Sequence, residues 1–130
     1  MRVLIADDQK GVGTTLAGLV ESCGHEVVQV VGSGLEAIQA YTRFRPDVVL
    51  MDFFMPRLNG ATACRMILSK HPEAKIVIVT GNPAAAEQAA TGAVSILPKP
   101  VDLNRLYGAL YDAAPQRSRP AEPPHEQSAD

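Results

Sequence analysis

Five short runs rich in β-branched residues recur along the chain, and this alternation limits the folds open to it. They occupy residues 3–6, 27–31, 48–51, 76–79 and 94–97. Several are apolar throughout rather than at every second position, which predicts strands buried on both faces. Helix-like stretches separate them. Strands alternating with helices predict an α/β fold, in which right-handed crossovers build a doubly wound parallel sheet within a three-layer sandwich.

The expected helices begin and end at recognisable residues. Ser33 with Glu36 three residues later forms a capping box, and Asn59 and Asp102 are N-cap residues of later helices. Gly24 is of the type that ends a helix. A short, alanine-rich helix is expected over residues 84–90.

Apolar residues at helical spacing predict which helix faces contact the sheet. In the first helix they recur at i, i+4, i+7, i+8 and i+11. The residues expected to be buried are Val12, Leu16, Leu19, Val20, Cys23, Leu35, Ile38, Tyr41, Met66, Ile67, Leu103, Leu106 and Leu110.

Composition sets the broad class of protein. The chain has 130 residues, 46% of them hydrophobic, with a net charge of −2. The length fits one domain, expected over residues 1–114, and the charge disfavours direct nucleic-acid binding. Residues 115–130 contain four prolines and no aliphatic side chain larger than alanine, which predicts a disordered tail.

Other features concern the compartment. No apolar run approaches the roughly 20 residues of a membrane span, and the opening apolar run is too short for a secretion signal. Cys23 and Cys64 form no CxxC motif, which suits reduced thiols. A cytoplasmic protein is therefore expected.

Polar residues follow four of the five predicted strands. Asp7 and Asp8 follow the first, Asp52 the third, Thr80 the fourth and Lys99 the fifth. Taken singly, an aspartate after a strand is more often a turn or cap residue. In a parallel sheet, however, the carboxyl ends of the strands meet at one edge, so these five residues are expected to lie together.

Their chemistry is coherent. Three neighbouring carboxylates repel one another unless a cation is present, and hard oxygen ligands favour Mg²⁺. An aspartate carboxylate can attack phosphorus to form an acyl phosphate. Lys99 and Mg²⁺ would offset charge on the phosphoryl oxygens, and the Thr80 hydroxyl could donate to one of them.

A flavodoxin-like flavin or nucleotide-binding protein is the alternative on the same topology. Gly11 and Gly13 follow the first strand, as in dinucleotide-binding motifs, but position 16 is Leu16 where a third glycine is needed. A metal-independent interaction module is a third reading, against which the full acidic set argues.

The sequence resembles the response-regulator receiver family over residues 1–114. The most specific segment is 52–60, DFFMPRLNG, which is similar to the family's phospho-acceptor turn D-x-x-M-P-x-x-N/D-G. Residues 3–9, 80–81 and 97–100 resemble its other signature segments. The resemblance implies a five-stranded sheet of order 2-1-3-4-5 with five helices.

It also implies a role for each residue of the acidic set. Asp52 is the implied phosphorylation site, and Asp8, Asp52 and the backbone carbonyl of Phe54 are implied direct ligands of Mg²⁺. Asp7 would act on the metal through water. The residues two after the acceptor and two after the switch threonine, here Phe54 and Asn82, would flank the path of the hydrolytic water.

Thr80 and Lys99 complete the implied site, as the switch hydroxyl and the phosphate-pairing lysine, with a cis bond between Lys99 and Pro100. The implied phosphodonor is a histidine kinase or a histidine phosphotransfer protein, and the implied output is a contact with an unidentified downstream protein or onward phosphotransfer. A receiver of this kind is expected to be a monomer or weak dimer and not an enzyme beyond promoting its own phosphorylation and dephosphorylation.

Three features depart from the family pattern. Ile96 stands where the family usually has Tyr or Phe. The 19 residues from Thr80 to Lys99 are fewer than usual by roughly three, about one helical turn. Pro98, near the end of the fifth strand, cannot donate to a ladder, which an edge strand tolerates. These departures predict a weakened output surface around the fourth and fifth helices.

Overall fold

A computed structural model describes residues 1–114 of the chain, and in it strands and helices alternate throughout. The strands are β1 (Arg2–Ala6), β2 (Glu26–Val31), β3 (Val48–Asp52), β4 (Ile76–Thr80) and β5 (Ser95–Pro98). The helices are α1 (Lys10–Ser22), α2 (Gly34–Phe44), α3 (Gly60–Lys70), α4 (Pro83–Gln88) and α5 (Leu103–Ala113). The predicted tail, residues 115–130, lies outside the described residues, so the domain boundary stays a prediction.

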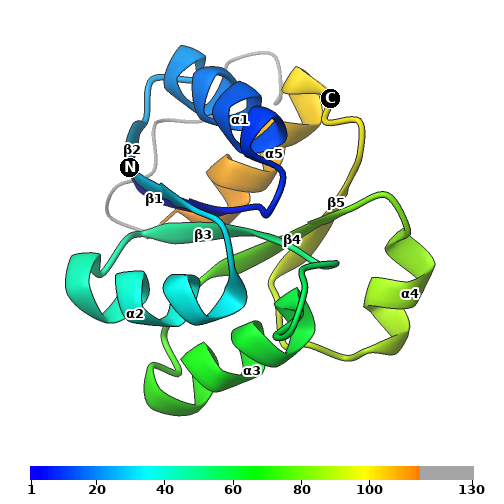
Figure 1. Cartoon of the computed structure of the whole chain (residues 1–130). Coiled ribbons are helices and arrows are strands. Elements are labelled where there is room, and N and C mark those ends of the chain that lie inside the picture. The colour runs from blue at the N-terminus through cyan, green and yellow to red at the C-terminus, as the bar shows by residue number, and fades with distance from the viewer. Residues whose placement is uncertain (115–130) are drawn as a thin grey trace, which may run out of the picture.

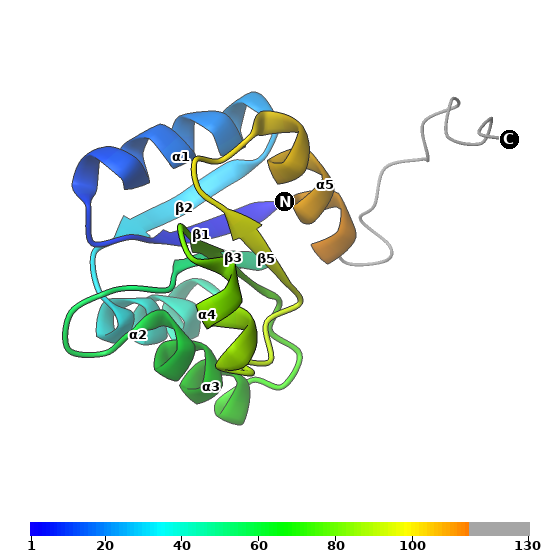
Figure 2. The ribbon, with the colours of Figure 1, turned by 90° about the vertical axis from the view of Figure 1, so that its right-hand side faces the viewer.

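The strands form one parallel sheet in the order β2-β1-β3-β4-β5. Helices α1 and α5 cover one face, and α2, α3 and α4 cover the other (Figure 1, Figure 2). The predicted doubly wound sandwich and its strand order are confirmed. None of the helices within residues 1–114 is both long and apolar enough to cross a membrane.

Burial follows the position of each strand in the sheet. Strands β3 and β4 are buried at every residue, as their uninterrupted apolar sequences predict. Strand β2 lies at an edge and is largely accessible. Strand β5 lies at the opposite edge, where Pro98 pairs with Thr80.

The predicted helix caps are present. The Asn59 side chain accepts a hydrogen bond from the backbone N–H of Thr62 at 2.9 Å, and Asp102 accepts one from Arg105 at 3.0 Å. Ser33 caps α2, but the second half of its predicted capping box differs. The Glu36 carboxylate accepts from the backbone N–H of Gly32 at 2.9 Å.

Some predictions of burial are wrong, and in α2 and α3 most of the buried positions are occupied by small residues instead. Leu35, Met66 and Leu103 are 56%, 45% and 47% exposed. In α2 the buried positions are taken by Gly34, alanines and Tyr41, and a Cβ atom on Gly34 would lie 2.6 Å from the Leu58 carbonyl oxygen. Leu35, the next residue, lies on the exposed side of the helix.

The fourth helix is shorter than the expected 84–90 segment. It covers six residues, Pro83–Gln88, and Asn82 rather than an alanine begins it by accepting from the Ala85 N–H at 3.2 Å. Ala90 follows with a left-handed φ of 51°. The helix therefore ends two residues before the alanine-rich composition suggests.

Candidate functional site

The strand register brings the predicted polar residues to one edge of the sheet. Asp52 is the last residue of β3 and pairs with Val79, next to Thr80 at the end of β4. Asp7 follows β1, and its N–H donates to the Val31 carbonyl at 3.0 Å. The Lys99 N–H donates to the Thr80 carbonyl at 2.8 Å, which fixes the start of the β5–α5 loop.

Lys99 joins two of the three carboxylates. Its Nζ lies 3.1 Å from Asp7 Oδ2 and 3.3 Å from Asp52 Oδ1. Burial lowers the pKa of Lys99, but hydrogen bonding and attraction from Asp7 and Asp52 outweigh it, so the net shift is upward. The ammonium is therefore charged at neutral pH. The Lys99–Pro100 peptide bond is cis, as the resemblance implies.

Asp52 is strongly perturbed. It is only 5% exposed, and burial raises its pKa, as does repulsion from Asp7. Lys99 acts in the opposite direction, and the resulting pKa is about 6. A single lysine thus compensates the carboxylates incompletely, which leaves the site attractive to a second cation.

The donor set fits a small, hard divalent ion. Asp7, Asp8 and Asp52 each offer one carboxylate oxygen, and these oxygens lie within 4.8 Å of one another. Opposite oxygens of an Mg²⁺ octahedron are separated by about 4 Å. Asp7 and Asp52 are buried while Asp8 is exposed, so the cluster is open to solvent on one side. These observations favour Mg²⁺ among the biological cations.

The turn after β3 holds Asp52 through its backbone. The Gly60 N–H donates to the Phe53 carbonyl at 2.8 Å, and the Phe53 N–H donates to the Val79 carbonyl at 3.1 Å. A Cβ atom on Gly60 would collide with the Asp52 carbonyl. A glycine at the start of α3 is therefore what lets the turn close directly behind the Asp52 carboxylate.

Phe54 lies two residues beyond Asp52. Its side chain is 56% exposed, and its ring meets that of Phe53 edge-on with centroids 4.8 Å apart. The ring therefore remains accessible to solvent. The assignment of its backbone carbonyl as a metal ligand stays a prediction.

Thr80 is fully buried, and its side chain already has a partner. The Asn82 N–H donates to Thr80 Oγ1 at 3.0 Å. That bond uses an acceptor position of the hydroxyl and leaves its proton available to another oxygen. Because Asn82 also begins α4, the hydroxyl is linked to that helix by one residue.

Gly11 and Gly13, which suggested a nucleotide-binding motif, have a different role. Gly11 and Gly13 lie in the first turn of α1, not in a phosphate-binding loop. A Cβ atom on Gly13 would lie 2.9 Å from Val30 Cγ1, so this glycine permits close packing of α1 on β2. The described geometry gives this alternative no support.

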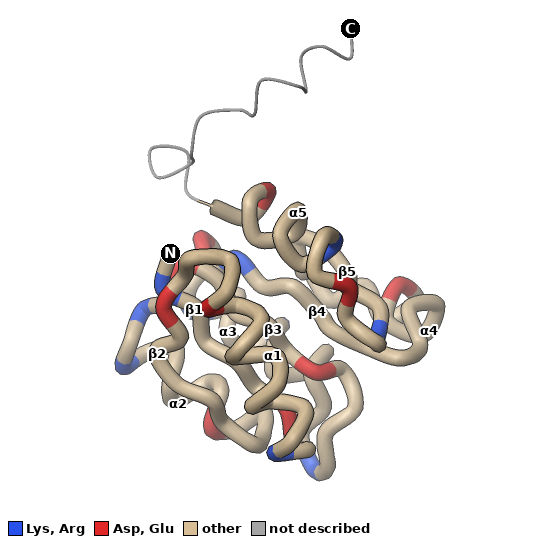
Figure 3. Tube along the Cα trace, turned by 90° about the horizontal axis from the view of Figure 1, so that it is seen from above, with Lys and Arg blue, Asp and Glu red and all other residues tan. Residues whose placement is uncertain are grey.

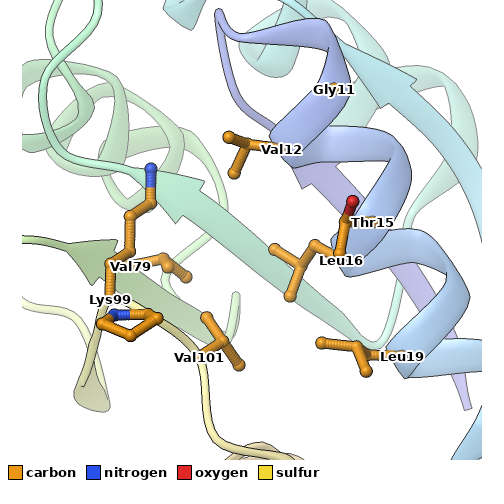
Figure 4. A pocket seen from close by; sticks show the side chains of 9 residues that line it. Gly11, Val12, Thr15, Leu16, Leu19, Val79, Lys99 and Val101 are labelled. Atoms are coloured by element: carbon orange, nitrogen blue, oxygen red, sulfur yellow. The ribbon is translucent and has the colours of Figure 1, made fainter.

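An apolar groove lies beside the carboxylate cluster, between α1 and the loop after Lys99. It has a volume of about 510 Å³ and is lined by Val12, Thr15, Leu16, Leu19, Val79, Lys99, Pro100, Val101 and Gly11. Figure 4 shows the side chains of α1 on one side and those of Lys99 and Val101 on the other. Val12 and Leu19, expected in the core, are only half-buried because they face this groove. Sequence periodicity identified the helix face but not the space in front of it.

Comparisons with known proteins agree with this arrangement. Residues 3–111 match the model of the response regulator receiver domain. The chain is 34% identical to chemotaxis protein CheY of Thermotoga maritima, over 84% of this chain and 93% of that protein. It is 45% identical to protein-glutamate methylesterase/protein-glutamine glutaminase 4 of Geobacter metallireducens, over 77% of this chain but only 30% of that protein.

Solved structures give the same result. A response regulator receiver domain protein from Clostridium thermocellum superposes with a TM-score of 0.77 and 30% identity, covering 86% of this chain and 92% of that one. The response regulator domain of Thermotoga maritima CheB superposes with a TM-score of 0.74 and 29% identity, covering 86% and 91%. The chain belongs to the response regulator receiver domain family.

Proposed function

We propose that Asp52 accepts a phosphoryl group from a phosphohistidine of a histidine kinase or histidine phosphotransfer protein. The observation that carries this proposal is the meeting of Asp7, Asp52 and Lys99, with one ammonium 3.1 and 3.3 Å from two buried carboxylates. The phosphorylated protein then signals through a protein contact or passes the group onward. It catalyses no other reaction and acts in the cytoplasm as a monomer or weak dimer.

Asp7, Asp8 and Asp52 would hold Mg²⁺, together with the Phe54 carbonyl. When bound, the ion supplies positive charge that stabilises the phosphoryl oxygens and lets the carboxylates stay ionised together. The residues of the chain divide the remaining work. Asp8, the exposed member, keeps the cluster open to the incoming group.

The transfer itself needs an ionised Asp52. A carboxylate oxygen attacks phosphorus, and the new O–P bond forms as the N–P bond of the donor breaks. The electron pair of that bond returns to the imidazole nitrogen of the donor, which takes a proton from solvent. Lys99 lies within reach of the carboxylate and offsets charge on the phosphoryl oxygens. Thr80 then donates its free proton to one of those oxygens.

The groove beside Lys99 is the surface we propose for the donor protein. Lys99 lines both the groove and the carboxylate cluster, so a partner seated there lies directly beside Asp52. The apolar side chains of Val12, Leu16 and Leu19 would contact an apolar helix face of the partner. Within residues 1–114, Lys and Arg are interspersed with Asp and Glu in Figure 3, which gives a nucleic-acid partner no support.

Intact mass spectrometry tests the assignment. The protein is incubated with acetyl phosphate and Mg²⁺, and wild type is compared with Asp52→Asn and with the control Asp102→Asn. Wild type and the control should each gain one phosphoryl group that is removed by hydroxylamine and prevented by EDTA. Equal labelling of Asp52→Asn would show that the acceptor is a different residue.

A further inference from the structure

Asn82, the N-cap of helix α4, is hydrogen-bonded both to this helix and to the hydroxyl of Thr80. The Asn82 side chain accepts from the Ala85 N–H, and the Asn82 N–H donates to Thr80 Oγ1 at 3.0 Å. Any movement of the Thr80 side chain toward a phosphoryl group therefore reaches the N-cap of α4 directly. What the helix then does depends on how its other end is held.

Three residues of α3 contact the α4–β5 connection, residues 89–94. Arg65 Nη1 donates to the Ala89 carbonyl at 3.2 Å, at the C-cap of α4. The buried thiol of Cys64 hydrogen-bonds with the side chain of Thr91, and burial raises the pKa of this thiol to about 11. Farther along α3, Leu68 packs where Gly92 has no side chain.

The backbone of this connection is specialised for close contact. Ala90 and Gly92 both have left-handed φ angles, of 51° and 87°. A Cβ atom on Gly92 would lie 2.9 Å from Leu68 Cδ1. The hydroxyl of Thr91, 6% exposed between them, also accepts from the Ala93 N–H at 3.1 Å. A connection with this conformation and these contacts cannot slide along α3 without breaking them.

We propose that α3 anchors the α4–β5 connection through Cys64, Arg65 and Leu68, so that phosphorylation moves Asn82 and the first turn of α4 but not the rest of the helix. This inference rests on the proposed function of Asp52 and Thr80. A helix of six residues held at both ends has no free segment to carry a displacement. Ile96, in β5, likewise has no ring to reorient beneath it.

Hydrogen exchange of the full chain with and without beryllofluoride and Mg²⁺ tests the anchor. In wild type the mimic should alter protection at residues 80–84 and leave residues 86–98 unchanged. Arg65→Ala removes the exposed hydrogen bond to the Ala89 carbonyl. The loss of one such bond corresponds to roughly fivefold faster exchange of the amides that it protects. In that variant, exchange over 86–98 should become dependent on the mimic. Lys70→Ala, an exposed cation of the same helix, should behave as wild type.

The outcomes separate the anchor from the proposed function. If Arg65→Ala speeds exchange over 86–98 equally in the free and mimic-bound protein, Arg65 has only a structural role and the anchor is wrong. Large mimic-induced changes over 86–98 in wild type also contradict it, provided that residues 52–55 become protected. No protection at 52–55 would contradict the proposed function itself, and the anchor with it.

Discussion

Asp52 lies in an environment that disfavours its ionised form. Burial and then repulsion from Asp7 raise its pKa from 3.8 to about 6. A carboxyl group whose pKa is higher in the folded than in the unfolded protein destabilises the fold once it ionises. This destabilisation is absent below about pH 4 and is complete above about pH 6. The metal-free site is therefore strained at neutral pH.

We expect Asp52→Asn to be more stable than wild type by about 1–3 kcal/mol at pH 7 in EDTA, and nearly equal to it at pH 4. Urea unfolding at the two pH values measures the difference. Asp102→Asn is the matched control, because an exposed N-cap aspartate is replaced there by a residue that caps equally well. A gain of the same size at both pH values would show that it does not arise from ionisation of Asp52.

Phe54 presents an apolar ring two residues beyond Asp52, the proposed acceptor. It is 56% exposed and offers no hydrogen bond to a water that approaches the phosphoryl group. We expect slow loss of the phosphoryl group, and roughly tenfold faster loss in Phe54→Asn, because one positioning hydrogen bond of about 1.4 kcal/mol changes a rate tenfold. Decay of the phosphorylated mass measures it. Phe54→Leu should match wild type, and an unchanged rate in Phe54→Asn would refute the shielding role.

The individual residues differ in how far the sequence reveals them. Asp7, Asp52 and Lys99 could be placed together because each directly follows a strand whose composition is unmistakable. Thr80 was expected to donate a hydrogen bond, but its bond from Asn82 depends on the local turn geometry. The half-burial of Val12 and Leu19 depends on a groove formed with residues 99–101, far away in the sequence.

Among the elements, the turn from β3 into α3 tolerates least change. Because a Cβ atom on Gly60 would collide with backbone atoms of Asp52, no side chain can move aside to make room. We expect Gly60→Ala to destabilise the protein by about 3 kcal/mol. Gly18→Ala, in the middle of α1 with no atom close to its Cβ position, should instead stabilise by about 0.5–1 kcal/mol. Denaturant unfolding of both variants tests this, and equal effects would refute it.

At the end of α4, introducing a glycine is expected to stabilise the protein. Ala90 has a φ of 51°, in the left-handed region that favours glycine. Ala90→Gly should therefore stabilise the protein by about 0.5–1 kcal/mol in spite of the added entropy of the unfolded chain. Ala84→Gly, inside the same helix, should destabilise by about 1 kcal/mol. If both substitutions destabilise equally in thermal melts, Ala90 is not left-handed.

Sequence composition could not predict where α4 ends. All seven residues from 84 to 90 are alanine, glutamate or glutamine, which have good helix propensity, yet the helix stops at Gln88. The reason is a tertiary contact. Arg65 donates a hydrogen bond to the Ala89 carbonyl at the end of the helix, and these two residues are 24 residues apart in the sequence. Caps such as Asn59 and Asp102 could be predicted because they act on the next few residues.

In the molecule as a whole, the sheet topology was predictable from the sequence. The charge balance at the edge of the sheet where the carboxylates lie is a property to be tested by experiment. Three carboxylates face one lysine at that edge, whereas the chain carries a net charge of only −2. A cation that binds only the folded state stabilises it in proportion to the logarithm of its concentration, by about 2.7 kcal/mol at a hundredfold excess over Kd. The carboxylate edge should therefore couple Mg²⁺ to global stability.

We expect MgCl₂ to raise the melting temperature clearly at pH 7.5 and little at pH 5. Below the Asp52 pKa of about 6, that carboxyl group is protonated and no longer attracts the ion, so the increment must shrink as the pH falls. Circular dichroism melts measure it, with NaCl at matched ionic strength as the control for screening. Asp52→Asn should lose most of the increment in melting temperature at pH 7.5. Only two of the three carboxylates remain in this variant, and Lys99 already neutralises one of them, Asp7. An equal rise with NaCl, or a rise in Asp52→Asn as large as in wild type, would mean that Mg²⁺ does not bind at this edge.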